Sequence, residues 1–311
     1  MRPSIVCLGG GTGLSTVLRG LKAVGAEPTA IVTLTDDGGS SGRLRRDLDM
    51  PPPGDVRSCL VALAEDESFM ANMFQHRFSR GELAGHNLGN LFLAALTELA
   101  GSFDAAVALT SHALAIAGQV LPATRRHAVL VAEMEDGRIV AGETAVATDR
   151  SHVRRLRLEP AAPDPHPDAV AAIASADLIV LGPGSLFTST LPPLLVPAIR
   201  EAIFATRARR VYVANLLQQL GETIGYDAAH HLDRLTQHVG PGLVDTVVVP
   251  AARRVHTDSL IPVDFVRRDL DDRVADVVAA HITRGHHHDP VRLARLLVRQ
   301  ARRPAPQREA P

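Results

Sequence analysis

The chain has few aromatic residues, no tryptophan and a single lysine. Phe, Trp and Tyr together make up 3% of its 311 residues, so the stacked aromatic platforms used by single-strand nucleic-acid binders are hard to build here. Lys22, the one lysine, lies in the middle of a predicted helix and does not follow a glycine. This placement argues against a Walker A phosphate loop, kinase-like chemistry and a Schiff-base lysine.

The net charge is small, cysteines are few and long apolar runs are absent from the sequence. The formal net charge of -1 argues against a global attraction to nucleic acid or anionic membranes. Cys7 and Cys59 lack metal or redox spacing, so we expect buried free thiols. No run approaches the roughly 18 apolar residues of a membrane helix, and the start lacks a signal-peptide layout. We therefore expect a cytoplasmic protein with no nucleic-acid partner and no membrane insertion.

A glycine run that closes a short apolar strand is the most informative feature present. Ile5-Val6-Cys7-Leu8 is followed by Gly9-Gly10-Gly11-Thr12-Gly13, and an apolar helical stripe begins at Leu14. Glycines let backbone amides approach an anion, and the positive end of the helix points at the same place, which indicates a phosphate site. A dinucleotide fingerprint would need glycine in place of Leu14, so a dehydrogenase is a weak interpretation. The alternative is a tight strand-to-helix turn without a ligand.

A second predicted strand, Ala30 to Thr35, also ends in a polar loop. Parallel strands bind ligands beyond their carboxyl ends, so this loop and the glycine loop should face one cleft. Asp36 or Asp37 is placed to hold a ribose hydroxyl or a divalent ion, although both could be plain turn residues. The loop's candidate binding residues are Asp36, Asp37, Ser40, Ser41, Gly42 and Arg43.

Further candidates follow later predicted strands or begin predicted helices. A helix capped by Asp55 carries Arg57 in its first turn, where a cation is tolerable if it reaches an anion, although a solvated arginine is the alternative. The remaining binding candidates are His86, Asn87, Asn90, Gly182, Gly184, Ser185 and Asn215. His86 could equally be a bystander in a helix-start loop. The tract His286-His287-His288-Asp289 lacks partner ligands at recognised metal spacing and is interpreted as a solvated loop.

The order of strands and helices predicts an α/β fold with a doubly wound, mostly parallel, Rossmann-like sheet. We expect a single nucleotide-binding domain over residues 1–300. Residues 101–170, with β-like runs at 128–132 and 139–141, are a candidate for a small inserted α/β segment. Residues 301–311 are predicted to be a disordered tail.

The chain resembles the YvcK family of bacterial proteins, the gluconeogenesis factors, because these motifs occur in the same order. This family shares a fold with the 2-phospho-L-lactate transferase (CofD) family. The matching blocks occur in one order between residues 9 and 186. They are Gly9 to Leu14, Asp36 to Arg45 through Pro51 to Arg57, Phe74 to Phe78, His86 to Asn90, Met134 to Gly137, and Gly182 to Leu186.

The resemblance implies a cytoplasmic protein that binds a nucleotide sugar such as UDP-N-acetylglucosamine, or an NAD-like dinucleotide. It further implies a regulatory role in cell shape and in growth on gluconeogenic carbon sources. A homo-oligomer and a protein partner in cell-envelope metabolism remain open. The transferase relatives move a phospholactyl group from a guanylylated donor with a divalent metal, so a Mg²⁺-dependent transferase is the second interpretation. No catalytic residue is assigned.

One loop departs from the family pattern. After the strand that ends at Asn215, the family has T-Q-x-G-E-T-D-G-Y/F, whereas this chain has Gln218 and Ile224 in place of the threonine and the aspartate. An isoleucine cannot replace the metal or hydroxyl contacts of a carboxylate. The role of this loop, and with it the ligand preference, is therefore in question.

Overall fold

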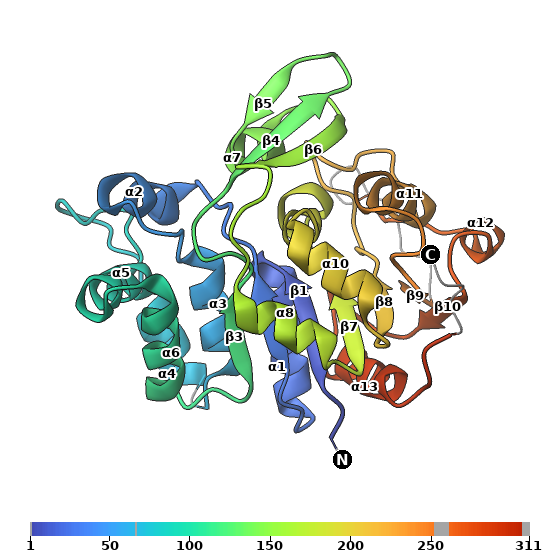
Figure 1. Cartoon of the computed structure of the whole chain (residues 1–311), viewed down its shortest axis with the longest axis horizontal. Coiled ribbons are helices and arrows are strands. Elements are labelled where there is room, and N and C mark those ends of the chain that lie inside the picture. The colour runs from blue at the N-terminus through green and yellow to red at the C-terminus, as the bar shows by residue number, and fades with distance from the viewer. Residues whose placement is uncertain (1, 66, 252–260, 307–311) are drawn as a thin grey trace.

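Seven parallel strands form the central sheet of the computed structural model, which describes residues 2–65, 67–251 and 261–306 (Figure 1). Their spatial order is β10-β9-β8-β7-β1-β2-β3. The strands are β1 (Ile5–Gly9), β2 (Thr29–Val32), β3 (Gln119–Pro122), β7 (Leu178–Leu181), β8 (Arg209–Val213), β9 (Thr246–Pro250) and β10 (Asp276–Ala280). Strands β1, β2 and β3 follow one another toward one edge of the sheet, and β7, β8, β9 and β10 follow one another toward the other edge. The predicted doubly wound, Rossmann-like sheet is confirmed.

Helices cover both faces of this sheet, and each face has its own hydrophobic core. One core joins Ile5 and Cys7 of β1 to one set of helices, and the other joins Val6 and Leu8 to a second set. The first set is α1 (Gly11–Ala23), α3 (Gly54–Leu63), α4 (Glu67–Gln75), α5 (Leu88–Ala100), α6 (Phe103–Ala113) and α13 (Pro290–Ala301). The second is α8 (Pro167–Ala174), α9 (Leu191–Leu194), α10 (Pro197–Ala205), α11 (Ala228–Val239) and α12 (Arg267–Asp271). Burial on both faces explains why β1 is apolar at every position.

A second, antiparallel sheet of order β5-β4-β6 stands beyond the carboxyl ends of the main strands (Figure 1). It consists of β4 (Val129–Met134), β5 (Ile139–Ala141) and β6 (Val153–Glu159), with α7 (Glu143–Thr148) between β5 and β6. This sheet falls within residues 101–170, where the sequence predicts an inserted segment. Leu130, Val146 and Leu156 join the core of the second helix set, so the small sheet packs on the main one.

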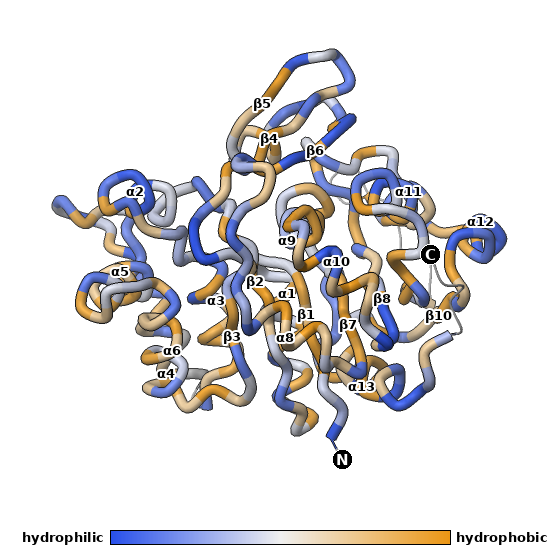
Figure 2. Tube along the Cα trace, viewed as in Figure 1, coloured by the Kyte–Doolittle hydropathy of each residue, from blue (hydrophilic) through white to orange (hydrophobic). Residues whose placement is uncertain are grey.

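The hydropathy of the chain follows this arrangement (Figure 2). The central strands are hydrophobic, whereas α2 (Gly39–Leu48) and α12 are hydrophilic. Within the described ranges no single helix is long and apolar enough to cross a membrane; the bent pair α5 and α6 meets the requirement by length and composition only.

Several elements differ from the sequence predictions. The polar loop after β2 is short, because α2 begins at Gly39 and buries Leu44. The helical segment after Gly184 is divided into a π-helical turn η1 (Leu186–Thr190), α9 and α10. Prolines in the first turns of α9 and α10 explain the division, since proline lacks an amide hydrogen and favours a helix start.

The predicted tail lies partly outside the described residues, which end at 306. Helix α13 extends to Ala301, and the Arg209 guanidinium donates a hydrogen bond to the Pro304 carbonyl at 2.6 Å. Arg303 also donates a hydrogen bond to Asp276 at 2.8 Å, so this part of the chain lies near the first residues of β8 and β10.

Candidate functional site

A cavity of about 330 Å³ lies beyond the carboxyl ends of β1, β7 and β8. Strand order reverses between β1 and β7, and ligands of open α/β sheets bind in the crevice at this switch point. The loops after β1, β7 and β8 all contribute to the wall. The lining residues are Gly10 to Gly13, Thr16, Pro183 to Ser185, Ser189, Asn215 to Leu217, Gln219 and His286 to His288.

The glycine loop presents backbone to the cavity and packs tightly on its other sides. A Cβ atom at Gly13 would overlap the Pro183 carbonyl, so the loops after β1 and β7 touch backbone to backbone. A Cβ atom at Gly10 would overlap a carboxylate oxygen of Asp55. Helix α1 starts at Gly11 with no acidic residue in its first turn. No carboxylate of the helix itself opposes an anion at its amino-terminal end, although the Asp55 carboxylate of α3 already accepts a hydrogen bond from the Gly11 amide.

Asn215 fixes the loop after β7. Its side-chain oxygen accepts a hydrogen bond from the Gly184 amide at 3.0 Å, and its side-chain nitrogen donates to the Gly184 carbonyl at 2.7 Å. Asn215 is buried, and its amide group thus holds the wall of the cavity. Gly182 has a positive φ of 68° and starts this turn.

Glu222 holds the next residues of the same wall. Its carboxylate accepts hydrogen bonds from the Ser185 hydroxyl, from the Thr188 hydroxyl at 3.0 Å and from the Phe187 amide at 3.2 Å. Burial raises the pKa of Glu222, while these three donors lower it in part. The hydroxyl of Ser185 therefore serves the packing of this turn, and Glu222 was not foreseen from the sequence.

On the other side of the glycine loop lies a group of carboxylates, Asp36, Asp55 and Glu143. Burial and the negative charge of Asp36 raise the pKa of Asp55 to about 6, while a hydrogen bond from the Gly11 amide and the charge of Arg57 oppose the rise. Burial, with the charges of Asp55 and Asp36, also raises the pKa of Glu143, whose carboxylate accepts a hydrogen bond from Thr35. These carboxylates lie close enough to repel one another.

The two predicted metal or ribose ligands have different surroundings. One oxygen of Asp37 accepts hydrogen bonds from the Thr144 amide at 2.9 Å and its hydroxyl at 2.7 Å, which ties the loop to α7. Asp36 accepts a hydrogen bond from the Gly38 amide at 2.9 Å. A Cβ atom at Gly54 would lie 2.7 Å from the other Asp36 oxygen. Asp36 thus faces the start of α3, next to Asp55.

The other candidates on α2 and around His86 interlock with one another. Ser40 accepts a hydrogen bond from the Asn87 amide at 3.2 Å, and its hydroxyl lies 3.3 Å from His86 Nδ1. Asn87 caps α5 by accepting from the Asn90 amide, and Asn90 donates to Ser41 at 3.3 Å. Burial lowers the pKa of His86, and the charge of Arg43 adds to this effect.

Arg43, Arg57 and Gly42 are also fixed by contacts with their neighbours in this network. Arg57 donates to the Asn90 side-chain oxygen at 3.0 Å, and Arg43 donates to the Ala84 carbonyl at 3.0 Å. Within residues 2–65, 67–251 and 261–306, the buried Nε atom of Arg57 has no hydrogen-bond partner. A Cβ atom at Gly42 would overlap the Asp37 carbonyl, which fixes the first turn of α2.

The predicted candidates thus divide into two adjoining groups. Gly10 to Gly13, Gly184, Ser185 and Asn215 belong to the cavity, and Gly9 and Gly182 end the strands beside it. Asp36, Asp37, Ser40 to Arg43, Arg57, His86, Asn87 and Asn90 form the polar network behind the glycine loop and do not line this cavity. Asp55 joins the groups because it contacts Gly10 and Gly11.

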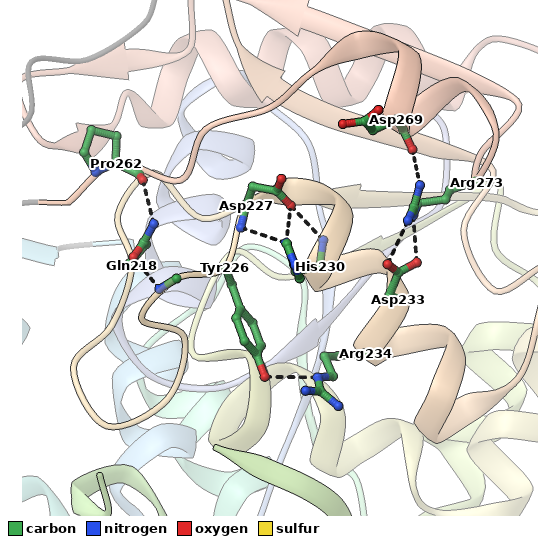
Figure 3. Close-up of polar contacts among 10 residues, drawn as sticks. Gln218, Tyr226, Asp227, His230, Asp233, Arg234, Pro262, Asp269 and Arg273 are labelled. Atoms are coloured by element: carbon green, nitrogen blue, oxygen red, sulfur yellow. Dashed lines mark hydrogen bonds and ion pairs between the residues drawn. The ribbon is translucent and has the colours of Figure 1, made fainter. Parts of the chain in front are cut away.

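The loop that departs from the family pattern is tied to its neighbours by Gln218 (Figure 3). The Gln218 side chain accepts from the Gly225 amide at 2.8 Å and donates to the Pro262 carbonyl at 3.2 Å. A threonine side chain has no amide group with which to make both contacts. Tyr226, at the loop's end, accepts a hydrogen bond from Arg234 of α11 at 3.0 Å. Gln218 therefore has a local structural role in this chain.

The histidine tract is exposed at His286 and His287, as expected for a solvated segment, but it belongs to a hairpin and not to an irregular loop. His287–His288 forms β12, which pairs antiparallel with β11 (Thr283–Arg284), and His286 to His288 line the cavity. In the part of the chain that the structure describes, no group of three His, Cys, Asp or Glu side chains is arranged to hold a metal ion. The tract is thus part of the wall of the cavity.

A second hollow, of about 610 Å³, lies away from the glycine loop. It is formed by the end of α2, the junction of α5 and α6, and residues 125–127, and none of the predicted candidates lines it. Arg125 and Arg126 face it together with Asp49, Asp104 and Asp164, so its charges are mixed in sign.

The sheet order and the position of the cavity define a Rossmann-like α/β protein with a crevice at the switch point. Residues 5–282 match the model of the family described as "2-phospho-L-lactate transferase CofD", and the chain belongs to this family. It is 46% identical over 309 residues to the gluconeogenesis factor of Bacillus subtilis, covering 96% of this chain and 98% of that one. The gluconeogenesis factor of Listeria innocua is 44% identical over 267 residues, covering 86% and 83%.

A solved structure agrees with this assignment. The crystal structure of a member of the UPF0052 family from Bacillus halodurans is similar with a TM-score of 0.92 and 42% sequence identity. The alignment covers 96% of this chain and 99% of that one. The resemblance to the YvcK and CofD families that the sequence motifs indicate is therefore confirmed.

Proposed function

We propose that this chain is a cytoplasmic nucleotide-sugar-binding regulatory protein whose ligand is of the UDP-N-acetylglucosamine type. We further propose that it supports cell shape and growth on gluconeogenic carbon sources. The single observation that carries the binding proposal is the cavity at the β1 and β7 switch point, walled by two glycine turns and the start of α1. The name gluconeogenesis factor, given to relatives that align over most of this chain, supports the physiological part.

A thermal-shift panel tests the binding proposal. The panel contains UDP-N-acetylglucosamine, UDP, GDP, NAD⁺ and inorganic phosphate, each with and without Mg²⁺. A ligand that binds only the native state stabilises it by about 2.7 kcal/mol at a concentration of 100 Kd. We expect the UDP sugar to raise Tm the most. A panel in which no nucleotide raises Tm would contradict the proposal.

Thr12 provides a matched pair of variants for this test. Thr12 is exposed, lies in the first turn of α1 and lines the cavity. Thr12→Asp adds a carboxylate where the helix dipole favours it, so the fold should be retained, but the new charge repels a bound phosphate. Thr12→Ser keeps the hydroxyl and adds no charge. We expect T12D alone to abolish the thermal shift and to fail to restore growth of a deletion strain on a gluconeogenic carbon source.

The carboxylates behind the glycine loop favour a second candidate function, a Mg²⁺-dependent transferase. Mg²⁺ is commonly held by one or two carboxylates together with substrate phosphates and water. The repulsion between Asp36 and Asp55 is of the kind that a cation relieves, whereas Asp37 is engaged with Thr144. Asp36 and Asp55 would therefore hold the ion, which would neutralise phosphate charge during transfer.

Turnover distinguishes the two candidates. Mg²⁺-dependent consumption of a guanylylated or uridylylated donor, lost in Asp36→Asn, would establish the transferase. Saturable binding without consumption of the ligand would favour the regulatory protein. Size-exclusion chromatography with light scattering would test whether the protein is the homo-oligomer that the family resemblance leaves open. Affinity capture with wild type and T12D would test for a ligand-dependent protein partner in cell-envelope metabolism.

A further inference from the structure

A short hairpin forms part of the wall of the cavity. Its strands pair Thr283 with His288 and Arg284 with His287, and the turn between them is Gly285-His286, with Gly285 at a positive φ of 57°. His286, His287 and His288 all line the cavity together with the glycine loop. The hairpin begins directly after residue 282, where the match to the family model ends.

The hairpin is held in a fixed position relative to the start of α1. The Asp289 amide donates to the Ile282 carbonyl at 2.7 Å, which closes the base of the hairpin. The Asp289 side chain caps α13 by accepting from the Arg292 amide at 2.9 Å. A Cβ atom at Gly20 would overlap the Pro290 carbonyl, so α13 and α1 meet backbone to backbone. The histidines and the amides of the glycine loop are therefore carried by two packed helices.

The histidines also determine which charge the cavity can offer. Among the described residues that line it, only the three histidines have side chains that can carry a positive charge; the others are Gly, Thr, Pro, Ser, Asn, Leu and Gln. Amides and the dipole of α1 can satisfy one phosphate group. A second phosphate linked to the first would extend from the glycine loop and would need donors on another wall. The hairpin supplies imidazole N–H donors on such a wall.

We propose that the β11–β12 hairpin is the second phosphate subsite of this cavity, and that its histidines select diphosphate-containing ligands over nucleosides and monophosphates. This inference rests on the proposed nucleotide binding and adds the ligand class and the residues that read it. The first phosphate lies against Gly11 to Gly13, and the second lies between the glycine loop and His286 to His288.

The test uses the exposed histidines, because their replacement leaves the core intact. His286 and His287 are exposed, and His286→Gln/His287→Gln keeps polar side chains of similar length without a positive charge. His281→Gln is the matched control, because His281 is exposed, lies just before the hairpin and does not line the cavity. The probes are inorganic pyrophosphate, UDP, UMP and uridine, measured by isothermal titration calorimetry on the full chain.

We expect the double variant to bind pyrophosphate and UDP about tenfold more weakly, with UMP and uridine changed less than about twofold. His281→Gln should bind all four probes like the wild type. Adding His288→Gln should weaken pyrophosphate binding further. Unchanged pyrophosphate and UDP binding in the double variant, or an equal loss for uridine, would overturn the inference. A wild-type protein that binds none of the nucleotides would instead overturn the proposed function.

Discussion

Replacing Asp55 with asparagine should stabilise the protein at neutral pH and leave its stability nearly unchanged in mild acid. Asp55 lies against Gly10 and Gly11, next to the carboxylates of Asp36 and Glu143. Asparagine has nearly the same shape, and its side-chain oxygen can still accept the hydrogen bond from the Gly11 amide. The substitution therefore removes mainly the negative charge.

The expected magnitude follows from the raised pKa of Asp55. The reference pKa of an aspartate is 3.8, whereas burial and Asp36 raise the pKa of Asp55 to about 6. At about 1.4 kcal/mol per pH unit, this difference corresponds to about 3 kcal/mol. The native state holds the proton more tightly, so between roughly pH 4 and pH 6 it carries more protons than the unfolded chain. The free energy of unfolding must then fall as pH rises through this interval.

Glu143 contributes in the same direction, because its pKa is also raised by burial and by its acidic neighbours. The Asp55 side chain keeps part of its surface accessible to solvent, so about 3 kcal/mol is an upper bound for its own contribution. Glu143 retains its titration in the Asp55→Asn variant. The free energy of unfolding should therefore depend less steeply on pH in the variant than in the wild type, but it should still depend on pH.

Urea denaturation of both proteins at intervals from pH 4 to pH 8 measures this effect. The Asp55→Asn variant should exceed the wild type by about 2 to 3 kcal/mol at pH 7 to 8, and the difference should shrink toward zero near pH 4. Asp47→Asn is the control, since Asp47 is exposed on α2. A variant that is less stable than the wild type at pH 7, or a difference independent of pH, would refute the reasoning.

Three further substitutions test the walls of the cavity. Gly13→Ala should cost about 2 to 3 kcal/mol of unfolding free energy, because its Cβ atom would overlap a carbonyl group, whereas Gly25→Ala, with open space around it, should cost about 1 kcal/mol. Glu222→Ala should lower the free energy of unfolding by about 3 kcal/mol, because alanine leaves three donors without their acceptor, whereas Glu222→Gln should lower it by about 1 kcal/mol. Equal losses for the two variants in urea denaturation would argue against this role of Glu222. Asn215→Asp should lower UDP affinity about tenfold in calorimetry, because an oxygen then faces the Gly184 carbonyl; unchanged affinity would contradict it.

The sequence predicts the central strands well, for a physical reason. Strands buried on both faces are continuous apolar runs, and β1 and β7 are of this kind. The strands β3 and β10 lie at the two edges of the sheet, and their short segments begin with Gln119 and Asp276. Their polar first residues and their partial exposure interrupt the apolar run, so the sequence gives no clear signal for these two strands.

The site was predictable only at the level of loops. Carboxyl ends of parallel strands share one edge of a sheet, so the glycine loop, Gly184 and Asn215 could be placed together. The sequence could not show that Asp37 pairs with Thr144, because the partners are 107 positions apart and no local pattern links them. Two aspartates of one loop therefore lie in different surroundings, although they are adjacent in the chain.

The histidine hairpin shows the same limit more clearly. A run of histidines beside Gly285 has the composition of a solvated loop, and only the packing of α13 on α1 brings it to the cavity. One local signal was available, since Asp289 followed by Pro290 is a typical helix start. It predicts α13, but the position of α13 depends on the close approach at Gly20, which is a long-range contact.

The glycine loop lies between two opposite electrostatic surroundings. Carboxylates approach it from the α3 side through Asp55, and the histidine hairpin faces it across the cavity. A phosphate bound at the amides would repel Asp55, so a proton or a cation on the carboxylate side would favour the binding that we propose. If Asp55→Asn stabilises the protein at neutral pH as we expect, stability alone does not explain an aspartate at this position, since asparagine would fit the same space. It is consistent with a site whose occupancy depends on the charge behind the loop.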